Sequence, residues 1–328
     1  SPDAGRMTQP FFRTIPAVVA LLCAAAVGAT PLATTREDFK LPGTQPSTIT
    51  DPIATPDTCA PCHANYGQPE VEPLHNWQGS MMAQASRDPL FWAALDVAVN
   101  DGGAGTGDWC LRCHVPKGGL HGRSEGNANA ERGCNLVGKM DRRPTRQNPS
   151  DLDGVTCHVC HRMMVNLNPP QGQQGVYFQN ADFWIDDGTC NGIGSPCRRG
   201  PYNYVNGGSP PDHAWAFSDY HVSSDNCGNC HNVTSPSKFL IQNGQPSTIP
   251  FPIERTFKEW QQSGYSQAEE GFRSCQSCHM PKAAGDPIAA CGAEMPNNRA
   301  GNLPVHQFAG GNAWIPGVLK AEYPGLNL

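Results

Sequence analysis

Hydrophobic residues in this chain seldom recur with the period of a helix or a strand, and the stretches where they do are short. The best helical pattern covers residues 81–100, in which Asp88 and Pro89 suit the cap and the first turn of a helix. Its expected apolar side consists of Leu90, Ala94, Leu95 and Val97. Residues 255–262 and 267–274 predict two more short helices. Alternating patterns are scarce, so few strands are expected.

One longer apolar run, residues 15–27, lies near the N-terminus shortly after Arg13. A basic residue, a short apolar run and small residues up to Ala29 are typical of a secretory signal peptide. The run is too short to span a bilayer comfortably, and no other stretch is apolar for long enough. Residues 1–29 therefore predict a leader plus a signal peptide that is removed on export, and no transmembrane span is expected.

Glycine and proline account for 35 and 31 of the 328 residues, well above their usual share. Such a chain makes many turns and leaves little aliphatic core. Residues 30–56 are rich in proline and threonine without periodicity and predict an extended N-terminal arm, while residues 121–150 and 185–210 predict loops. The rest of the chain, residues 57–328, is expected to form a single domain, mostly irregular with short α-helices.

Cysteine changes this picture, because the sequence Cys-x-x-Cys-His occurs five times in a chain with 15 cysteines. Chance predicts on the order of 0.02 such strings at this composition. The motif is typical of covalent haem c attachment, in which two thiols form thioethers and the adjacent imidazole binds the iron. The expected thioether cysteines are Cys59, Cys62, Cys110, Cys113, Cys157, Cys160, Cys227, Cys230, Cys275 and Cys278. The expected proximal iron ligands are His63, His114, His161, His231 and His279.

Two other uses of paired cysteines fit the sequence less well. Zinc sites do not require a histidine directly after every pair. A thioredoxin-type pair needs a βαβ setting, which a chain so rich in glycine and proline lacks. Each haem also buries a large apolar macrocycle, so five haems c would supply the core that aliphatic side chains do not. The expected fold class is therefore a haem-cored multihaem cytochrome c with few strands.

Low-spin haems need a second axial ligand, and six histidines lie outside the motifs. That number is close to the five that bis-histidine ligation of every iron requires. His121 is the expected spare and is predicted to be merely exposed. The expected distal ligands are His75, His158, His213, His221 and His306, of which His158 lies inside the third motif and can serve only a neighbouring haem. Methionine is the competing ligand, but packing is the expected role of the methionines.

Four cysteines beyond the signal peptide lie outside the motifs. Cys190 and Cys197 enclose the turn-forming run Asn-Gly-Ile-Gly-Ser-Pro, which predicts a local disulfide bond. Cys134 and Cys291 then pair by elimination in an oxidising compartment. The alternative is that these thiols are free and buried.

The formal net charge of the chain is −6, and the propionates of five haems would add to it. An acidic protein is poorly suited to nucleic acid, so no such partner is expected. Redox partner proteins, extracellular electron acceptors and further copies of the chain are the expected partners. Residues 101–108, with Asp at both ends and four glycines between them, could hold calcium, although a solvated loop is the commoner outcome.

Several motif contexts resemble the multihaem c-type cytochromes of metal-reducing and related bacteria. They are Cys-His-Val-Cys-His, Cys-Gly-Asn-Cys-His-Asn, Cys-Gln-Ser-Cys-His-Met-Pro and His-Gln-Phe-Ala-Gly-Gly-Asn, and the likeness covers roughly residues 57–315. The resemblance implies bis-histidine haems that form a continuous path for electrons. Some members of that broad family polymerise into extracellular filaments, so a filament subunit and a soluble periplasmic carrier both fit.

The sequence thus predicts an exported electron-transfer protein, extracellular or periplasmic, and not an enzyme. The alternative is a multihaem oxidoreductase of the nitrite or hydroxylamine type, which needs one haem with an open position. All five motifs end in histidine, and the distal candidates suffice for every iron. Both facts argue against an open haem.

Overall fold

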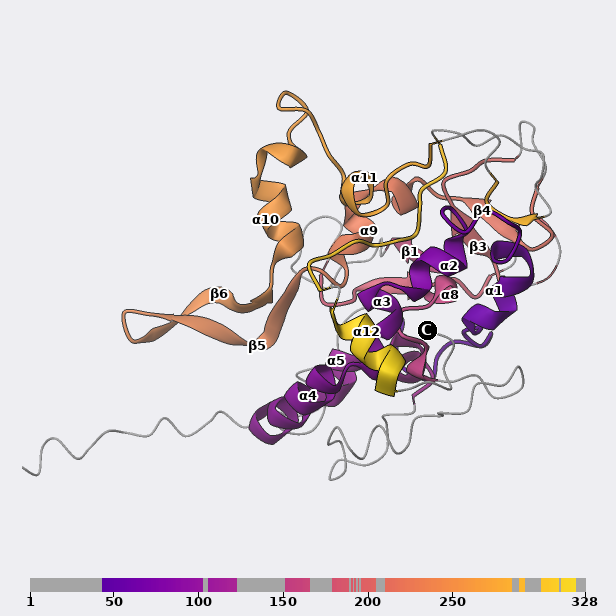
Figure 1. Cartoon of the computed structure of the whole chain (residues 1–328). Helices are drawn as coiled ribbons and strands as arrows, with labels where there is room; N and C mark the ends of the chain where they lie inside the picture. The colour runs from indigo at the N-terminus through magenta and orange to yellow at the C-terminus, as the bar shows by residue number, and fades with distance from the viewer. Residues whose placement is uncertain are drawn as a thin grey trace, which may run out of the picture. The chain divides into compact units, whose positions relative to one another are not determined.

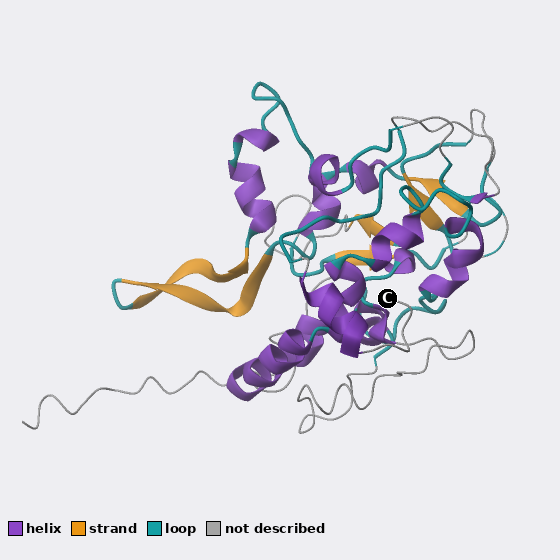
Figure 2. Cartoon of the chain, in the orientation of Figure 1, coloured by secondary structure: helices purple, strands orange, loops and turns teal. Residues whose placement is uncertain are grey.

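The computed structural model describes residues 43–102, 106–122, 151–165, 179–188, 190, 192, 194, 196–204, 210–284, 289–292, 302–312 and 314–322. Short helices joined by irregular segments dominate these parts of the chain (Figure 1; Figure 2). The expected signal peptide, residues 1–29, lies outside the described residues. So does nearly all of the expected loop at residues 121–150.

The helices are short, and several begin at a proline. Proline has no backbone N–H, which suits the first turn of a helix because an N–H at that position would have no partner in the helix. The α-helices are α1 (Pro56–His63), α2 (Pro73–Gln78), α3 (Met81–Gln84), α4 (Pro89–Gly102), α5 (Thr106–His114), α6 (Pro116–Leu120), α8 (Cys157–Cys160), α9 (Ser224–Gly228), α10 (Thr256–Gln262), α11 (Cys275–His279) and α12 (Trp314–Glu322). The 3-10 helices are η2 (Ala85–Arg87), η3 (Asp151–Asp153), η4 (Asp219–Val222) and η5 (Gly264–Ser266). None of the described helices is both long and apolar enough to cross a bilayer.

The described strands form three two-stranded sheets. They are β1 (Met163–Val165) with β2 (Phe183–Ile185), β3 (Arg198–Gly200) with β4 (Trp215–Phe217), and β5 (Val233–Gln242) with β6 (Gln245–Glu254). The first and third pairs are antiparallel and the second is parallel. Two of the pairs are only three residues long, which agrees with the expectation of few strands.

The long hairpin β5–β6 is absent from the elements predicted above. Its turn consists of Asn243 and Gly244, both with positive φ (52° and 76°), as a two-residue hairpin turn requires. The Asn-Gly pair was the available signal. Prolines in the following strand weakened it, because proline cannot donate a backbone hydrogen bond to a sheet.

The pattern at residues 81–100 predicted a helix correctly but its buried side wrongly. The structure breaks the helix before α4, and Asp88 caps the second part by accepting the N–H of Leu90 at 2.8 Å. Of the four residues expected on the apolar side, only Leu95 is buried; Leu90 is 64% exposed and Val97 59% exposed. The buried residues are instead Phe91, Trp92 and Leu95, which pack on α5. Helix α4 is apolar nearly all round, so periodicity could not identify its inner side.

The two short helices expected before the fifth motif have different outcomes. Helix α10 confirms the prediction at residues 255–262. The prediction at residues 267–274 is wrong, because this segment is a turn followed by irregular chain. Trp260 Nε1 donates to the carbonyl of Arg273 at 2.7 Å, which ties the segment to α10, and Gly271 has a φ of +84°, which a helix does not allow.

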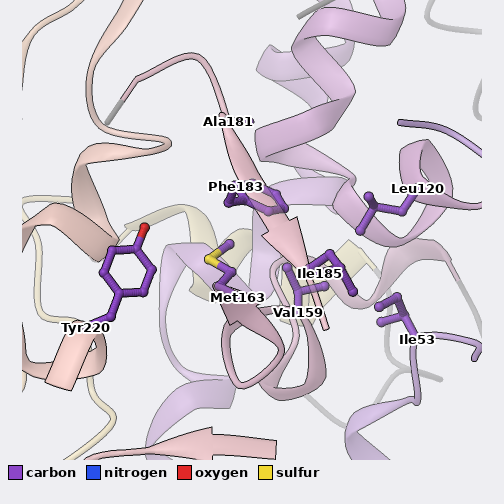
Figure 3. Close-up of a cluster of buried hydrophobic side chains, with 8 residues drawn as sticks. All are labelled: Ile53, Leu120, Val159, Met163, Ala181, Phe183, Ile185 and Tyr220. Carbon is purple, nitrogen blue, oxygen red and sulfur yellow. The ribbon is translucent and has the colours of Figure 1, made fainter. Parts of the chain in front are cut away.

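A cluster of buried apolar side chains lies behind the third motif, around β1, β2 and α8 (Figure 3). It consists of Ile53, Leu120, Val159, Met163, Ala181, Phe183, Ile185 and Tyr220. These side chains come from segments far apart in the sequence, so the cluster joins the N-terminal segment to the middle of the chain. A second cluster fills the space between α4 and α5.

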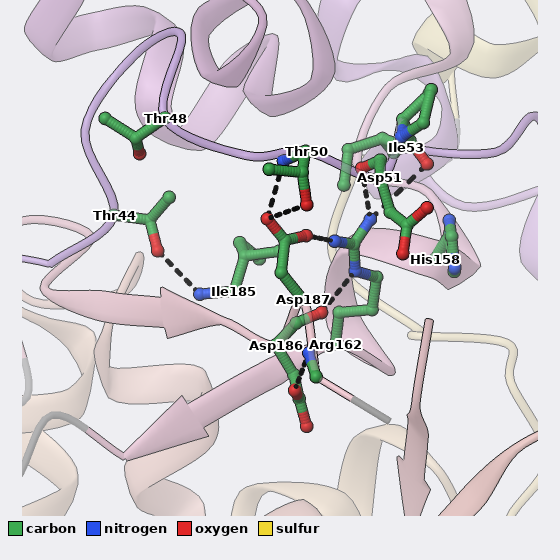
Figure 4. Close-up of polar contacts among 12 residues, drawn as sticks. Thr44, Thr48, Thr50, Asp51, Ile53, His158, Arg162, Ile185, Asp186 and Asp187 are labelled. Carbon is green, nitrogen blue, oxygen red and sulfur yellow. Dashed lines mark hydrogen bonds and ion pairs between the residues drawn. The ribbon is translucent and has the colours of Figure 1, made fainter. Parts of the chain in front are cut away.

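The described part of the expected N-terminal arm, from residue 43 to 55, lies along this core. The Thr44 hydroxyl accepts the N–H of Ile185 at 2.6 Å, and Ser47 donates to the carbonyl of Leu120 at 2.9 Å. The fully buried guanidinium of Arg162 donates to the carbonyls of Asp51 and Pro52 at 2.9 and 3.3 Å. The same guanidinium also binds the Asp186 carbonyl and the Asp187 carboxylate, so it ties the segment to β2 (Figure 4).

Candidate functional site

Each of the five motifs lies on or directly after a short helical turn: α1, α5, α8, α9 and α11. Residues three and four apart share one face of a helix, so the turn brings the two thiols and the imidazole of a motif together. Capping side chains fix some of these turns, because the Thr156 and Ser274 hydroxyls accept N–H groups of Val159 and Ser277 at 3.3 and 3.2 Å. After α9, the N–H groups of Cys230 and His231 both bond to the carbonyl of Cys227.

The motif thiols are half-buried, except for the exposed Cys62 and Cys278. Six of them form three contacts between motifs: Cys157 donates to Cys59, Cys227 to Cys275, and Cys230 to Cys113. The contact with Cys227 lowers the pKa of Cys275 to about 6, and the contact with Cys157 lowers the pKa of Cys59. The first motif therefore lies beside the third, and the second and fifth lie beside the fourth.

Several histidines are held in the same way, by a hydrogen bond from Nδ1 to a backbone carbonyl. The pairs are His63 with Ala290 (2.9 Å), His161 with Arg199 (2.6 Å), His279 with Ala309 (2.6 Å), His213 with Ala214 (3.0 Å) and His306 with Pro304 (3.0 Å). A carbonyl can only accept, so Nδ1 carries the proton and Nε2 keeps its lone pair. Such a hydrogen bond orients histidines that bind metals through Nε2.

Three histidine rings lie together beside the third motif. The ring centre of His161 is 5.6 Å from that of His221 and 6.2 Å from that of His306, with interplanar angles of 13° and 29°. Burial lowers the pKa of His221 to about 4 and that of His306 to about 3, and it also lowers the pKa of His161. A lowered pKa keeps the imidazole neutral, which is the form that binds a metal.

His158 is buried, with 3% of its surface exposed, but its contacts fit an iron ligand less well. Its Nδ1 accepts the N–H of Ala54 at 2.7 Å, so the neutral ring carries its proton on Nε2. That Nε2 has no hydrogen-bond partner. Burial, and then the charges of Arg162 and Arg198, lower the pKa of His158 to about 3. Ligation of a neighbouring iron by His158 stays a prediction, and it would require Nδ1 to give up Ala54.

The other histidines differ from one another in their surroundings. His75 on α2 is exposed, as are the motif residues His114 and His231. The ring of His114 stacks on Phe91, with 4.2 Å between ring centres. His121 is half-buried and its Nε2 accepts the N–H of Ile53 at 3.2 Å, so the prediction that it is merely exposed is wrong. Because this contact occupies Nε2, it fits the expectation that His121 is the spare histidine.

The two expected disulfide bonds differ in what the structure describes. Cys190 and Cys197 lie at bonding distance, with their Cα atoms 5.5 Å apart, as the prediction of a local bridge requires. Cys134 lies outside the described residues, so its pairing with Cys291 stays a prediction. Cys291 is half-buried close to Tyr66, whose pKa is raised mainly by burial.

Sequence reasoning did not single out the cations beside the histidines. The charge of Arg198 on β3 adds to burial in lowering the pKa of His63, His161 and His213. Arg162, directly after His161, is fully buried. The available signal was position, since each arginine directly follows a residue that the sequence did select.

A low-spin haem c site requires two thioether cysteines and one axial imidazole from the motif, and a further axial ligand from elsewhere in the chain. The motif turns and the Nδ1-to-carbonyl bonds fit these demands. Among the described residues, no group of three or more His, Cys, Asp or Glu side chains has the arrangement of a metal site. Residues 101–108, for which calcium binding is possible and a solvated loop is expected, fall partly outside them.

No protein-family model matches the chain, and neither a curated protein nor a solved structure matches it significantly. Its function must therefore be inferred from the residues of the site and their chemistry.

Proposed function

We propose that this protein is an exported multihaem c-type cytochrome that carries electrons through five covalently attached haems. The observation that carries the proposal is the fivefold occurrence of Cys-x-x-Cys-His. It is supported by the helical turns that hold the motifs and by the Nδ1-to-carbonyl bonds that leave Nε2 of His63, His161 and His279 as the metal-binding nitrogen. The thiol contacts between motifs support a compact array in which the haems lie close together.

In this proposal the haem iron supplies the change between Fe(III) and Fe(II), and the protein supplies ligation, spacing and exclusion of water. The motif cysteines hold each haem by two thioethers, so the cofactor cannot dissociate. The motif histidines would bind the iron, and the carbonyl partners of His63, His161 and His279 keep those three rings from turning. A second imidazole on the other side would hold the geometry nearly constant when the iron changes its charge.

The test is the haem content of the purified, mature protein. We expect five covalently bound haems per chain, measured by mass spectrometry of the denatured protein and by the pyridine haemochrome spectrum. A variant with Cys275→Ala and Cys278→Ala should retain four. Zinc in place of iron, or a chain mass without added haem, would overturn the proposal.

The contacts of three histidines favour one alternative. His121, His158 and His221 each have Nε2 or Nδ1 engaged in a way that opposes ligation through Nε2. If these contacts persist, three histidines outside the motifs remain for five irons. At least one iron can then keep an open position, as a nitrite or hydroxylamine reductase requires. Carbon monoxide binding to the reduced protein tests this alternative, because a protein with five bis-histidine haems should not bind it.

The partner we propose, besides redox proteins or an extracellular acceptor, is a second copy of the chain. The hairpin β5–β6 supports this choice because it carries five large apolar side chains between 43% and 64% exposed: Phe239, Ile241, Ile249, Phe251 and Ile253. Their exposed area is on the order of 500 Å², comparable with the patches that mark interaction sites. A soluble periplasmic carrier is the alternative form.

A further inference from the structure

The segment that carries His306 is fixed to the chain that follows the fifth motif. Ala283 donates to the carbonyl of Leu303 at 2.8 Å, and Val305 donates to that of Pro281 at 2.9 Å. The side chains of Leu303 and Val305 are buried, 2% and 8% exposed, in an apolar cluster with Val71 and Ala283. His306 is thus presented from a well-held segment and not from a loose loop.

From this segment the His306 ring reaches the third motif. Its centre lies 6.2 Å from that of the His161 ring, and the two planes differ by 29°. Two imidazoles that bind one metal from opposite sides, at about 2 Å each, have ring centres roughly 6 Å apart. The distance between the two ring centres is therefore that of a pair of axial ligands, and the stacked rings would turn their Nε2 atoms toward the iron when the haem is bound.

Both rings also present the same nitrogen for binding. Nδ1 of His161 donates to the Arg199 carbonyl at 2.6 Å, and Nδ1 of His306 donates to the Pro304 carbonyl at 3.0 Å. Each ring therefore has its Nε2 lone pair available, and each is fixed by main-chain atoms that a change of side chain would not remove.

His221 is the rival ligand, because its ring centre is even closer to that of His161, at 5.6 Å. Its two nitrogens have other partners, however. Nδ1 lies 3.0 Å from the Ser218 hydroxyl, and Nε2 lies 2.9 Å from the carbonyl of Cys160. Cys160 belongs to the third motif itself, so a ring bonded to its carbonyl lies on the motif's own side and not across the haem from it.

We infer that His306 is the second axial ligand of the iron bound by His161, in the haem attached to Cys157 and Cys160. The inference rests on the proposed function and adds to it, because the sequence alone could not assign any distal histidine to a particular haem. It makes a segment attached to the fifth motif complete the site of the third. His221 then lies beside this haem, hydrogen-bonded to the carbonyl of Cys160, and does not bind its iron.

The test compares His306→Ala with two matched variants, His221→Ala and His121→Ala, all as holoproteins. His306→Ala should keep five haems but convert one of them from low spin to high spin in visible and electron paramagnetic resonance spectra. Added imidazole should restore the low-spin signal. His121→Ala should keep the spectrum of the wild-type protein, and His221→Ala should leave the number of low-spin haems unchanged. His306→Met should keep that haem low-spin and raise one midpoint potential, since methionine ligation raises haem potentials.

A double variant identifies the haem. If His161 and His306 share an iron, His161→Ala with His306→Ala alters the same single haem as His306→Ala alone. Two altered haems would overturn the inference and leave the proposed function intact, as would an unchanged spin state in His306→Ala or loss of the low-spin signal in His221→Ala. Absence of covalent haem from the wild-type protein would instead overturn the proposed function, so the two failures are distinct.

Discussion

At the scale of single residues, the environment of each nitrogen and oxygen decides its role more than the residue type does. His121 and His306 are both histidines outside the motifs, yet Nε2 of His121 accepts a backbone N–H while Nδ1 of His306 donates to a carbonyl. The sequence can name the six candidates but cannot show these contacts. Ile53, which donates to His121, is 68 positions away in the chain.

Glu72 shows the same effect at a carboxylate and leads to a prediction. It is 3% exposed and accepts the N–H groups of Asn65, Tyr66 and Gln68 at 2.7, 2.9 and 3.0 Å. Burial raises the pKa of Glu72, but the backbone donors together outweigh it, so the net pKa is lowered. Glu72→Gln should cost about 2 kcal/mol of unfolding free energy at neutral pH, because an amide nitrogen would face N–H groups.

The pH dependence of this contribution follows from the direction of the pKa shift. A carboxyl with a depressed folded-state pKa stabilises the protein above its unfolded pKa, and that stabilisation is lost as pH falls through the folded value. Urea unfolding at neutral and at acid pH should therefore show the Glu72→Gln deficit shrinking with acid. Glu70→Gln, at an exposed neighbour, is the control and should cost little. An equal deficit at both pH values would contradict the assignment.

At the scale of elements, packing between short helices depends on very close approach. An added Cβ on Gly228 of α9 would lie 2.9 Å from the ring of Phe257, which is 2% exposed on α10. Gly228→Ala should therefore cost about 1–3 kcal/mol in unfolding experiments, since an overpacked contact forces neighbours to shift. Gly310→Ala, with nothing within 4 Å of the added atom, is the matched control. Adding Phe257→Leu to Gly228→Ala should recover part of the loss; no recovery would point to another cause.

The strap formed by residues 43–55 depends on one side chain, Arg162, that no pattern in the sequence selects. Arg162→Met removes the donors to Asp51, Pro52 and Asp186 and leaves Asp187 without its ion-pair partner. We expect a loss of about 3–5 kcal/mol. Hydrogen exchange should rise first in residues 43–55, while Lys258→Met, at an exposed position, should change neither quantity. Uniform exchange across the chain would argue against a strap.

At this scale, an element could be predicted from the sequence only where its residue pattern is compatible with a single structure. The cap at Asp88 and helix α10 were predictable from local chemistry. The buried side of α4 was not, because apolar residues occur on both sides and only the contact with α5 selects Phe91 and Trp92 over Leu90. The motifs themselves were fully predictable from spacing, whereas their neighbours were not, since a thiol of the third motif meets one of the first, about 100 positions earlier.

At the scale of the whole molecule, the residues that the structure describes include two apolar surfaces that are well separated in the sequence. One is the hairpin β5–β6, and the other is the outer side of α4, where Leu90 and Val97 are two turns apart. Pro246, Pro250 and Pro252 deprive β6 of N–H donors, so a partner would pack on the faces of the hairpin and would not extend its sheet. Two different surfaces that bind each other between copies give a head-to-tail contact, which continues unless a ring closes.

This arrangement predicts that the hairpin is required for self-association. A variant with Ile241→Thr, Phe251→Thr and Ile253→Thr keeps residues that favour strands and removes the apolar contact. Light scattering of the holoprotein should then report the mass of one chain, with haem content and spectra unchanged, whereas the wild-type protein should form larger assemblies. A variant with Tyr265→Thr and Phe272→Thr is the matched control, because both side chains are more than half exposed outside the hairpin and α4.

Val97→Asp should reduce assembly as the hairpin variant does, since it places a charge on the second surface, the outer side of α4. Assembly that persists in the hairpin variant would exclude this surface, and a wild-type protein that stays a single chain at every concentration would favour the soluble carrier.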